Sequence, residues 1–211
     1  MRRSRYKGHP EASATRRVRR VAVFMGTRPE VIKLAPVIKA LERSPGLQPL
    51  VISTGQHREM LDQIVETFDL RIDHDLDVMQ QDQDLATLTA RLIVGANALL
   101  ETLSPDFVLV QGDTASVWCT GMAAFYHGIP IGHVEAGLRT GDRYAPFPEE
   151  INRRLVTPLA ALHFAATDGA RRNLLAEGVP DASIEVTGNP VIDALQLECA
   201  RQAEPCARRR E

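Results

Sequence analysis

Two patterns of apolar residues alternate along most of the chain. Continuous runs rich in Val, Ile, Leu and Phe, such as those within residues 19–26 and 107–114, are separated by segments whose apolar positions recur every three or four residues. The continuous runs are typical of strands buried on both faces, and the second pattern is typical of amphipathic helices. Their alternation predicts a parallel sheet covered by helices on both faces.

Flanking turn residues place the individual elements. Strands are expected near residues 19–26, 50–54, 107–114, 129–135 and 162–167 and from 184, with helices near 28–41, 59–68, 85–103 and 115–126, from about 148, near 169–177 and from 190. We count about seven strand–helix units and no internal repeat. The prediction is a doubly wound, mostly parallel, Rossmann-like α/β domain, with a (β/α)8 barrel as the minor alternative.

Helix starts carry recognisable capping residues. Thr114, Thr167 and Asn189 each precede a predicted helix and are expected to act as N-caps, because their side-chain oxygens can accept a hydrogen bond from a free helix amide. Glu30 and Glu150 fall in predicted first turns, where a carboxylate is favoured by the helix dipole.

The two ends of the chain differ from its middle. We divide the sequence into a basic extension at residues 1–18, a Rossmann-like domain at 19–197 and an atypical tail at 198–211. The first twenty residues hold eight Arg or Lys against the single acid Glu11, and they lack both the apolar core of a signal peptide and interleaved aromatic residues. The extension is therefore expected to be disordered.

Composition narrows the class of protein further. The formal net charge of −2 gives no global indication of nucleic-acid or acidic-membrane binding, and no apolar run is long enough to span a bilayer. Cys119, Cys199 and Cys206 form no C-x-x-C pair, which disfavours a disulfide scaffold or a zinc site and suits a reducing cytoplasm. We expect a cytoplasmic protein without a membrane or nucleic-acid partner.

Polar residues at the ends of predicted strands are the candidates for chemistry. In an open α/β sheet, ligands bind in the crevice outside the carboxyl ends of the strands. Asp113 and Glu135 follow two such strands, Arg28 follows the first strand, and a loop containing Pro148 leads back to Glu149. Gln56 and His57, together, follow the second strand.

Each candidate also has an ordinary structural interpretation. Asp113 is well placed for an Asx-type cap, Glu149 for a favourable first-turn acid, and Arg28 for holding a carboxylate without touching a ligand. The structural interpretation is weakest for Glu135, which ends an apolar strand and has no polar neighbour along the chain. His133 is more typical of a hydrogen-bonded core histidine than of a base.

Neither G-x-G-x-x-G nor a Walker sequence is present, which disfavours NAD and P-loop nucleotides. Gly26 and Gly112 permit tight turns into helices whose N-termini favour an anion. Several carboxylates near an arginine suit proton transfer. The residues alone thus indicate an α/β enzyme that performs acid–base chemistry on an anionic ligand.

Five segments give a sharper indication. The runs "GTRPEVIKLAPVIKAL", "TGQHREMLDQ", "VQGDT", "AAFYHGIPIGHVEAGLRTGDRYAPFPEEINRR" and "TGNPVIDAL" resemble, in order, signature segments of the non-hydrolysing UDP-N-acetylglucosamine 2-epimerases. The resemblance implies interconversion of UDP-GlcNAc and UDP-ManNAc by anti elimination of UDP to 2-acetamidoglucal and its re-addition, with no metal or redox cofactor. The family's product feeds cell-surface polysaccharides.

The resemblance also assigns roles to individual positions. It places the family's acid–base carboxylates at Asp113, Glu135 and Glu149 and its active-site arginine at Arg28. Residues 56–57, Gln56 and His57, match contacts to a second UDP-GlcNAc that regulates some bacterial members. Which carboxylate acts as the base is left open.

The match covers one half of the family's architecture. Its members are homodimers whose subunits have two Rossmann-like domains in a GT-B arrangement, and the second domain supplies most UDP contacts. We therefore expect an epimerase N-terminal domain that does not turn over alone. The alternatives are a non-catalytic sugar-nucleotide-binding remnant, a half-enzyme that needs a separate C-terminal partner and, less favoured, a glycosyltransferase-like half domain.

Overall fold

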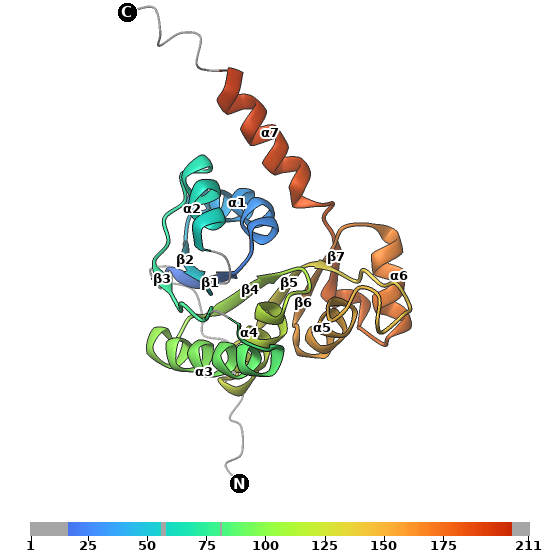
Figure 1. Ribbon diagram of the computed structural model, residues 1–211. Coiled ribbons are helices and arrows are strands. Elements are labelled where there is room, and N and C mark those ends of the chain that lie inside the picture. Colours follow the sequence, from blue (N-terminus) through green and yellow to red (C-terminus); the bar gives the residue numbers. More distant parts are fainter. Residues whose placement is uncertain (1–16, 56–57, 81, 204–211) are drawn as a thin grey trace, which may run out of the picture.

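A single parallel sheet organises the part of the chain that the computed structural model describes, residues 17–55, 58–80 and 82–203 (Figure 1). Within these residues the seven strands lie in the order β3-β2-β1-β4-β5-β6-β7, and every neighbouring pair is parallel. The strands are β1 (Arg19–Met25), β2 (Leu47–Ser53), β3 (His74–Asp75), β4 (Phe107–Gln111), β5 (Ile131–Ala136), β6 (Leu162–Ala165) and β7 (Ile184–Val186).

Helices follow the strands along the chain: the first six connect one strand to the next, and the seventh comes after the last described strand. They are α1 (Arg28–Arg43), α2 (Arg58–Thr67), α3 (Leu85–Leu103), α4 (Ala115–Tyr126), α5 (Glu149–Val156), α6 (Asp168–Ala176) and α7 (Pro190–Ala203), with short 3-10 turns η1 (Thr157–Leu159) and η2 (Asp181–Ser183). In Figure 1, α1 and α2 lie on one side of the sheet, α3, α4 and α5 lie on the other, and the far end of α7 projects from the body.

Two apolar clusters fill the space between the sheet and these layers. Alternate residues of β1 divide between them: Ala22 and Phe24 join the cluster shared with α3 and α4, whereas Val21 and Val23 join the cluster shared with α1. Strands with apolar side chains on both faces are the expected consequence of helices covering both sides. The predicted doubly wound α/β class is confirmed.

The strand order reverses direction between β1 and β4. The chain first moves outward through β2 and β3, and α3 then returns it to the opposite side of β1 before it continues through β5, β6 and β7. The loops after β1 and β4 consequently diverge to opposite faces and leave a crevice at their carboxyl ends. The candidate residues after these strands thus lie at the switch point of the sheet.

The sheet has one irregularity near that crevice. The pairing of β5 with β6 shifts between Val134 and Ala136, and the intervening residue, Glu135, has a left-handed φ of 62°. A non-glycine residue in this region is uncommon and costs roughly 1–3 kcal/mol unless its surroundings hold it there. The shift turns the Glu135 side chain out of the regular alternation of the strand.

Some sequence expectations need correction. β3, with only two residues, was not predicted. Thr167 is an N-cap, because its hydroxyl accepts a hydrogen bond from the Ala170 amide at 3.1 Å. The capping prediction for Thr114 is wrong: it occupies the N-cap position of α4, but its hydroxyl makes no cap bond and points to Glu30 instead.

The ends fall largely outside the described residues, which begin at 17 and stop at 203, so the predicted disorder of the basic extension stays a prediction. α7 continues without interruption past residue 197 to Ala203. In the stretches 17–55, 58–80 and 82–203 no helix has the combined length and apolar character required to cross a bilayer.

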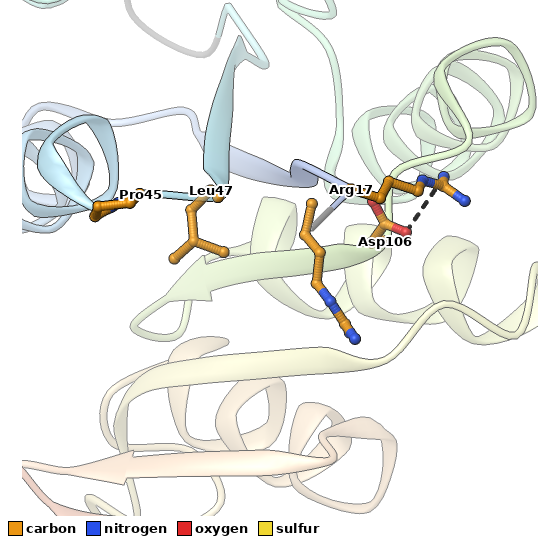
Figure 2. Close-up of a pocket in the computed structure, with 6 residues that line it drawn as sticks. Arg17, Pro45, Leu47 and Asp106 are labelled. Carbon is orange, nitrogen blue, oxygen red and sulfur yellow. Dashed lines mark ion pairs between the residues drawn. The ribbon is translucent and has the colours of Figure 1, made fainter. Parts of the chain in front are cut away.

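A pocket of about 570 Å³ lies at the opposite edge of the sheet, where β1, β2 and β4 begin (Figure 2). Arg17, Pro45, Leu47 and Asp106 line it, and the Arg17 guanidinium lies 3.5 Å from the Asp106 carboxylate. Asp106 also accepts a hydrogen bond from the Arg20 amide at 2.8 Å, which fastens the start of β1. This pocket is separated from the strand-end acids by the length of the strands.

Candidate active site

The turn that follows β4 holds Asp113. Gly112 has a φ of 83°, a conformation that glycine adopts without strain, and it turns the chain sharply from the strand toward α4. His133, on the neighbouring strand, donates from Nε2 to the Gly112 carbonyl at 2.7 Å, and Asn152 donates from Nδ2 to the Asp113 carbonyl at 2.9 Å. The backbone of this turn is therefore fixed from two sides.

The Asp113 carboxylate itself pairs with one cation. It accepts a hydrogen bond from the Arg153 guanidinium of α5. Burial raises the pKa of Asp113, Arg153 opposes that rise, and the nearby charges of Glu149 and Glu135 add to it. Asp113 is thus close enough to the other two candidate acids for their negative charges to make its own ionisation harder.

Glu135 lies in a different environment. The Lys33 ammonium and the Gln111 side-chain amide each donate to Oε2 at 2.5 Å, and the Asn189 side-chain amide donates to Oε1 at 2.9 Å. These donors come from α1, from the end of β4 and from the turn before α7. Both carboxylate oxygens are therefore held in place, one of them by a charged donor.

The backbone after Glu135 passes unusually close to α6. Gly137 has a φ of 84°, and a side-chain carbon added there would lie 2.3 Å from the Ala170 carbonyl oxygen, so glycine is required. Asn173 of α6 donates to the Gly137 carbonyl at 2.9 Å. Together these contacts fix the exit of β5, and with it Glu135, against α6.

The loop from Leu138 to Pro148 is held at both ends. Arg139 donates to both carboxylate oxygens of Glu177, at 2.7 and 2.6 Å, and the Thr140 hydroxyl donates to the Ala145 carbonyl at 2.5 Å. The peptide bonds preceding Pro146 and Pro148 are cis. The loop ends at the first turn of α5, beside the Asp113 turn.

The two adjacent acids of α5 have different roles. Glu150 is fully buried and accepts from the Thr140 amide at 3.2 Å and from Arg154 at 3.1 Å. Burial alone would raise the pKa of Glu150, but these donors and the charges of Arg153 and Arg154 outweigh it and lower that pKa. Glu149 is half-buried, and its negative charge contributes to the raised pKa of Asp113. The structural role predicted for Glu150 is consistent with this geometry.

The remaining predicted site residues are less fixed. Arg28 is the first residue of α1, at the carboxyl end of β1, and its side chain is exposed. It forms no ion pair with a carboxylate within the described residues, so holding a site acid in place is not its role there. Gln56 and His57 lie outside the described residues.

Several site residues were missed from the sequence. Lys33 and Gln111 contact Glu135, and Arg153 contacts Asp113, but none was singled out as a candidate. Asn189 was predicted only as a cap; its Oδ1 does accept from the Val191 amide at 3.1 Å, while its amide group reaches Glu135. The sequence did offer one indication of Gln111 as a site residue, because it lies at the end of a predicted strand. The same indication identified Asp113.

His133 is fully buried, as expected of a core histidine. Its Nε2 must carry a proton because it faces a carbonyl oxygen, which leaves Nδ1 unprotonated and without a hydrogen-bond partner in the described structure. Burial lowers the pKa of His133 to about 4. Its contact with Gly112 makes it a support for the Asp113 turn.

Comparison with known proteins bears directly on this arrangement. The family model described as UDP-N-acetylglucosamine 2-epimerase matches residues 39–210, which is most of the chain. The chain belongs to the UDP-N-acetylglucosamine 2-epimerase family. It is 53% identical over 176 residues to the UDP-N-acetylglucosamine 2-epimerase of Salmonella typhimurium and 51% identical over 176 residues to that of Escherichia coli K12.

A solved structure of this family agrees with the fold. The UDP-GlcNAc 2-epimerase from Neisseria meningitidis bound to UDP-GlcNAc is similar with a TM-score of 0.85 and 45% identity, over 89% of this chain and 50% of that chain. Each of the two enterobacterial relatives is matched over 83% of this chain and 47% of its own length. The chain thus spans about half the length of the relatives it matches and corresponds to one Rossmann-like half of a GT-B-type epimerase.

Proposed function

We propose that this chain supplies the acid–base half of a UDP-N-acetylglucosamine 2-epimerase, with UDP-GlcNAc and UDP-ManNAc as its sugar nucleotides. The observation that carries the proposal is the grouping of Asp113, Glu135 and Glu149 at the carboxyl edge of β4 and β5, in a chain of this family. The solved Neisseria meningitidis relative is described as bound to UDP-GlcNAc, which supports the ligand class.

The chemistry of epimerisation explains why several acids are needed. Inverting carbon C2 of the sugar requires removal of a proton from one face and delivery of a proton to the other. One carboxylate takes the C2 proton, the C–H electron pair forms the C1–C2 double bond, and the C1–O bond breaks with its electrons moving to UDP. Re-addition of UDP with protonation at the opposite face of C2 then gives the epimer.

The environments of the acids suit this division of labour. Burial and the neighbouring carboxylates raise the pKa of Asp113, whereas the Glu135 carboxylate is oriented by Lys33 and two amide donors. Different environments for two neighbouring carboxyl groups are what paired acid–base steps require. Arg28, which is exposed at the start of α1, and the N-terminal end of α4 are suited to the diphosphate.

Turnover is expected to need a second domain. The relatives are about twice as long, and a sugar nucleotide bound only to this half would have one side exposed to water. We propose a cytoplasmic protein, since nucleotide sugars are cytoplasmic metabolites and the three cysteines form no predicted pair. A homodimer, as in the family, is a further expectation for the longer form.

The test is an assay for UDP-ManNAc formed from UDP-GlcNAc, with incorporation of solvent deuterium at C2 as a second measurement. The 211-residue chain is assayed alone and after mixing with the C-terminal half of the Salmonella typhimurium relative. Activity only in the mixture would support the half-enzyme. Activity of the chain alone would overturn the need for a second domain.

The non-catalytic alternative rests on the same half-length match. Binding of UDP-GlcNAc without deuterium exchange, in both the chain and the mixture, would favour a sugar-nucleotide-binding remnant. Because the mixed assay uses an active relative's second half, a control with that relative's own N-terminal half shows whether the two halves can be reconstituted at all.

A further inference from the structure

Glu30 is a buried carboxylate that has no role in the proposed mechanism. It lies in the first turn of α1 and is only 3% exposed. An acid that merely complements a helix dipole can remain in solvent, where it costs nothing to keep charged. The burial of Glu30 therefore calls for another explanation.

Three donors surround the Glu30 carboxylate. The Gly26 and Thr27 amides donate to Oε2 at 2.5 and 2.9 Å, and the Thr114 hydroxyl donates to Oε1 at 2.6 Å. The first two bonds are local and close the turn between β1 and α1. The third joins residues 84 positions apart in the sequence and crosses the switch point from α1 to the start of α4.

The position of Thr114 gives this third bond its significance. Thr114 directly follows Asp113 and stands at the N-cap of α4, yet its hydroxyl makes no capping bond to its own helix. That hydroxyl donates its hydrogen bond to Glu30 instead. The Glu30 carboxylate thus connects the start of α1, where Arg28 lies, with the turn that carries Asp113.

We propose that Glu30 is a positioning residue that fixes the Asp113 turn relative to the start of α1, and so to Arg28, across the crevice. The proposal rests on the proposed function, since that function is what makes Asp113 and Arg28 the groups to be held. Glu30 touches neither the carboxylate of Asp113 nor any reacting atom; it acts through the Thr114 hydroxyl and the backbone of both turns.

A planar carboxylate suits this task better than other side chains. Its two oxygens face opposite directions, so that one serves two adjacent amides while the other reaches across the crevice. An apolar residue at position 30 would leave the Gly26 and Thr27 amides and the Thr114 hydroxyl without acceptors, at a cost for each buried group. Burial raises the pKa of Glu30, and the three donors oppose that rise.

Asp113 is consequently held from both sides of the crevice. His133 and Asn152 bind the carbonyls of residues 112 and 113 from the side of β5 and α5, and Glu30 holds the following residue from the side of β1 and α1. Active-site groups need such support because small displacements are costly for proton transfer.

The Asp113 carboxyl titration is the readout, followed by the side-chain carboxyl carbon signal in NMR spectra of the intact chain and assigned with Asp113→Asn. Glu30→Met removes both acceptor oxygens, and with them all three hydrogen bonds, at similar side-chain length. We expect the Asp113 pKa to fall toward the ordinary Asp value by about half a unit or more, because a loosened turn admits water. Glu30→Gln is the rescue variant: its amide can serve the same three partners and should leave the titration unchanged.

A second pair of variants keeps the test informative if Glu30→Met does not fold. Thr114→Val removes the crossing bond alone and should move the Asp113 pKa in the same direction, whereas Thr114→Ser should not. Thr54→Val is the matched control, because Thr54 forms a buried hydroxyl pair at 3.0 Å with Ser116 of α4 without contacting Glu30.

The same measurements can also contradict the positioning role of Glu30. If Glu30→Met and Thr114→Val lower the melting temperature but leave the Asp113 titration where it is, Glu30 is only a structural residue and the proposal is overturned. No sugar nucleotide is present in these titrations, so a failure of the epimerase assay leaves this result interpretable.

Discussion

Asp113 and Glu135 stand at the ends of neighbouring parallel strands, yet they are held in different ways. Glu135 is held through its carboxylate, by Lys33 and two amide donors, while its own backbone adopts a strained left-handed conformation. Asp113 is held mainly through the backbone of its turn, and its carboxylate pairs with the Arg153 guanidinium. Similar positions in a fold can therefore hold one acid through its side chain and the other through its backbone.

The largest expected effect concerns Glu135. In the reconstituted two-half enzyme, Glu135→Gln should reduce exchange of the C2 proton about a thousandfold, because the side chain loses its basicity while keeping its size. Deuterium incorporation in UDP-GlcNAc measures this. Glu185→Gln, at an exposed acid of β7, is the control. Unchanged exchange in Glu135→Gln would remove Glu135 from the mechanism.

The backbone support of Asp113 should be sensitive to acid through His133. Its pKa is about 4 in the folded protein, against an ordinary value of 6.5, so the unfolded chain binds the extra proton first as the pH falls. Stability conferred by neutral His133 is thus complete above about pH 6.5 and should decrease by about 3 kcal/mol by pH 4.

The measurement is urea unfolding, followed by fluorescence of Trp118, the single tryptophan of the sequence. His133→Gln is the comparison, because an amide N–H can still donate to Gly112 but does not titrate. Other groups, including the buried acids, titrate equally in both proteins. A difference between the two that does not vary between pH 7 and pH 4 would contradict the assigned role of His133.

Loss of the cation beside Asp113 should have a somewhat smaller effect. Arg153→Met is expected to lower the free energy of unfolding by about 2 kcal/mol at neutral pH, because it leaves a partly buried carboxylate without its charged donor. It should also raise the pKa of Asp113 further, since Arg153 opposes the effect of burial.

Arg154 provides the matched control for this variant, because it contacts the buried Glu150, as Arg153 also does, but does not pair with Asp113 within the described residues. Arg154→Met should therefore destabilise the protein less than Arg153→Met and should not raise the pKa of Asp113. Equal destabilisation by the two variants, measured by urea unfolding, would mean that the Asp113 pair has no special importance.

The smallest effect is expected from one of the three donors to Glu135. Asn189→Ala should cost about 1 kcal/mol, since it removes both a helix cap and one hydrogen bond to the carboxylate while Lys33 and Gln111 remain. Thr167→Ala removes a cap of the same kind from α6, away from Glu135. If both variants alter stability equally and Asn189→Ala leaves proton exchange intact, the bond from Asn189 does not support Glu135.

Much of this fold could be predicted because its strands are apolar on both faces and its helices are not. β3 was not predicted because its two residues, His74 and Asp75, form no apolar pattern. At the site, the rule that strand ends share one edge associated Asp113 with Glu135, and in the structure the charge of Glu135 acts on Asp113. It did not reveal Lys33, which belongs to an ordinary amphipathic helix pattern and meets Glu135 only through tertiary packing.

Capping and backbone geometry were harder to predict for a physical reason. Thr114 has the chemistry of an N-cap, but a buried acceptor on another element competes successfully for its hydroxyl. The left-handed φ of Glu135 has no local sequence signature, because a glutamate is an unfavourable residue for that region and is kept there by its surroundings.

The long sequence separation of the bonds at the switch point has a consequence for the order of folding. Lys33 and Glu135 are 102 residues apart, and Glu30 and Thr114 are 84 apart, so neither contact can form until two large chain segments have closed on each other. Packing of α3 on α4 needs far shorter loop closure and should appear earlier in refolding. Trp118 fluorescence should accordingly recover before the native contacts of the site acids form. The site is therefore expected to form late, when the rest of the domain has already folded.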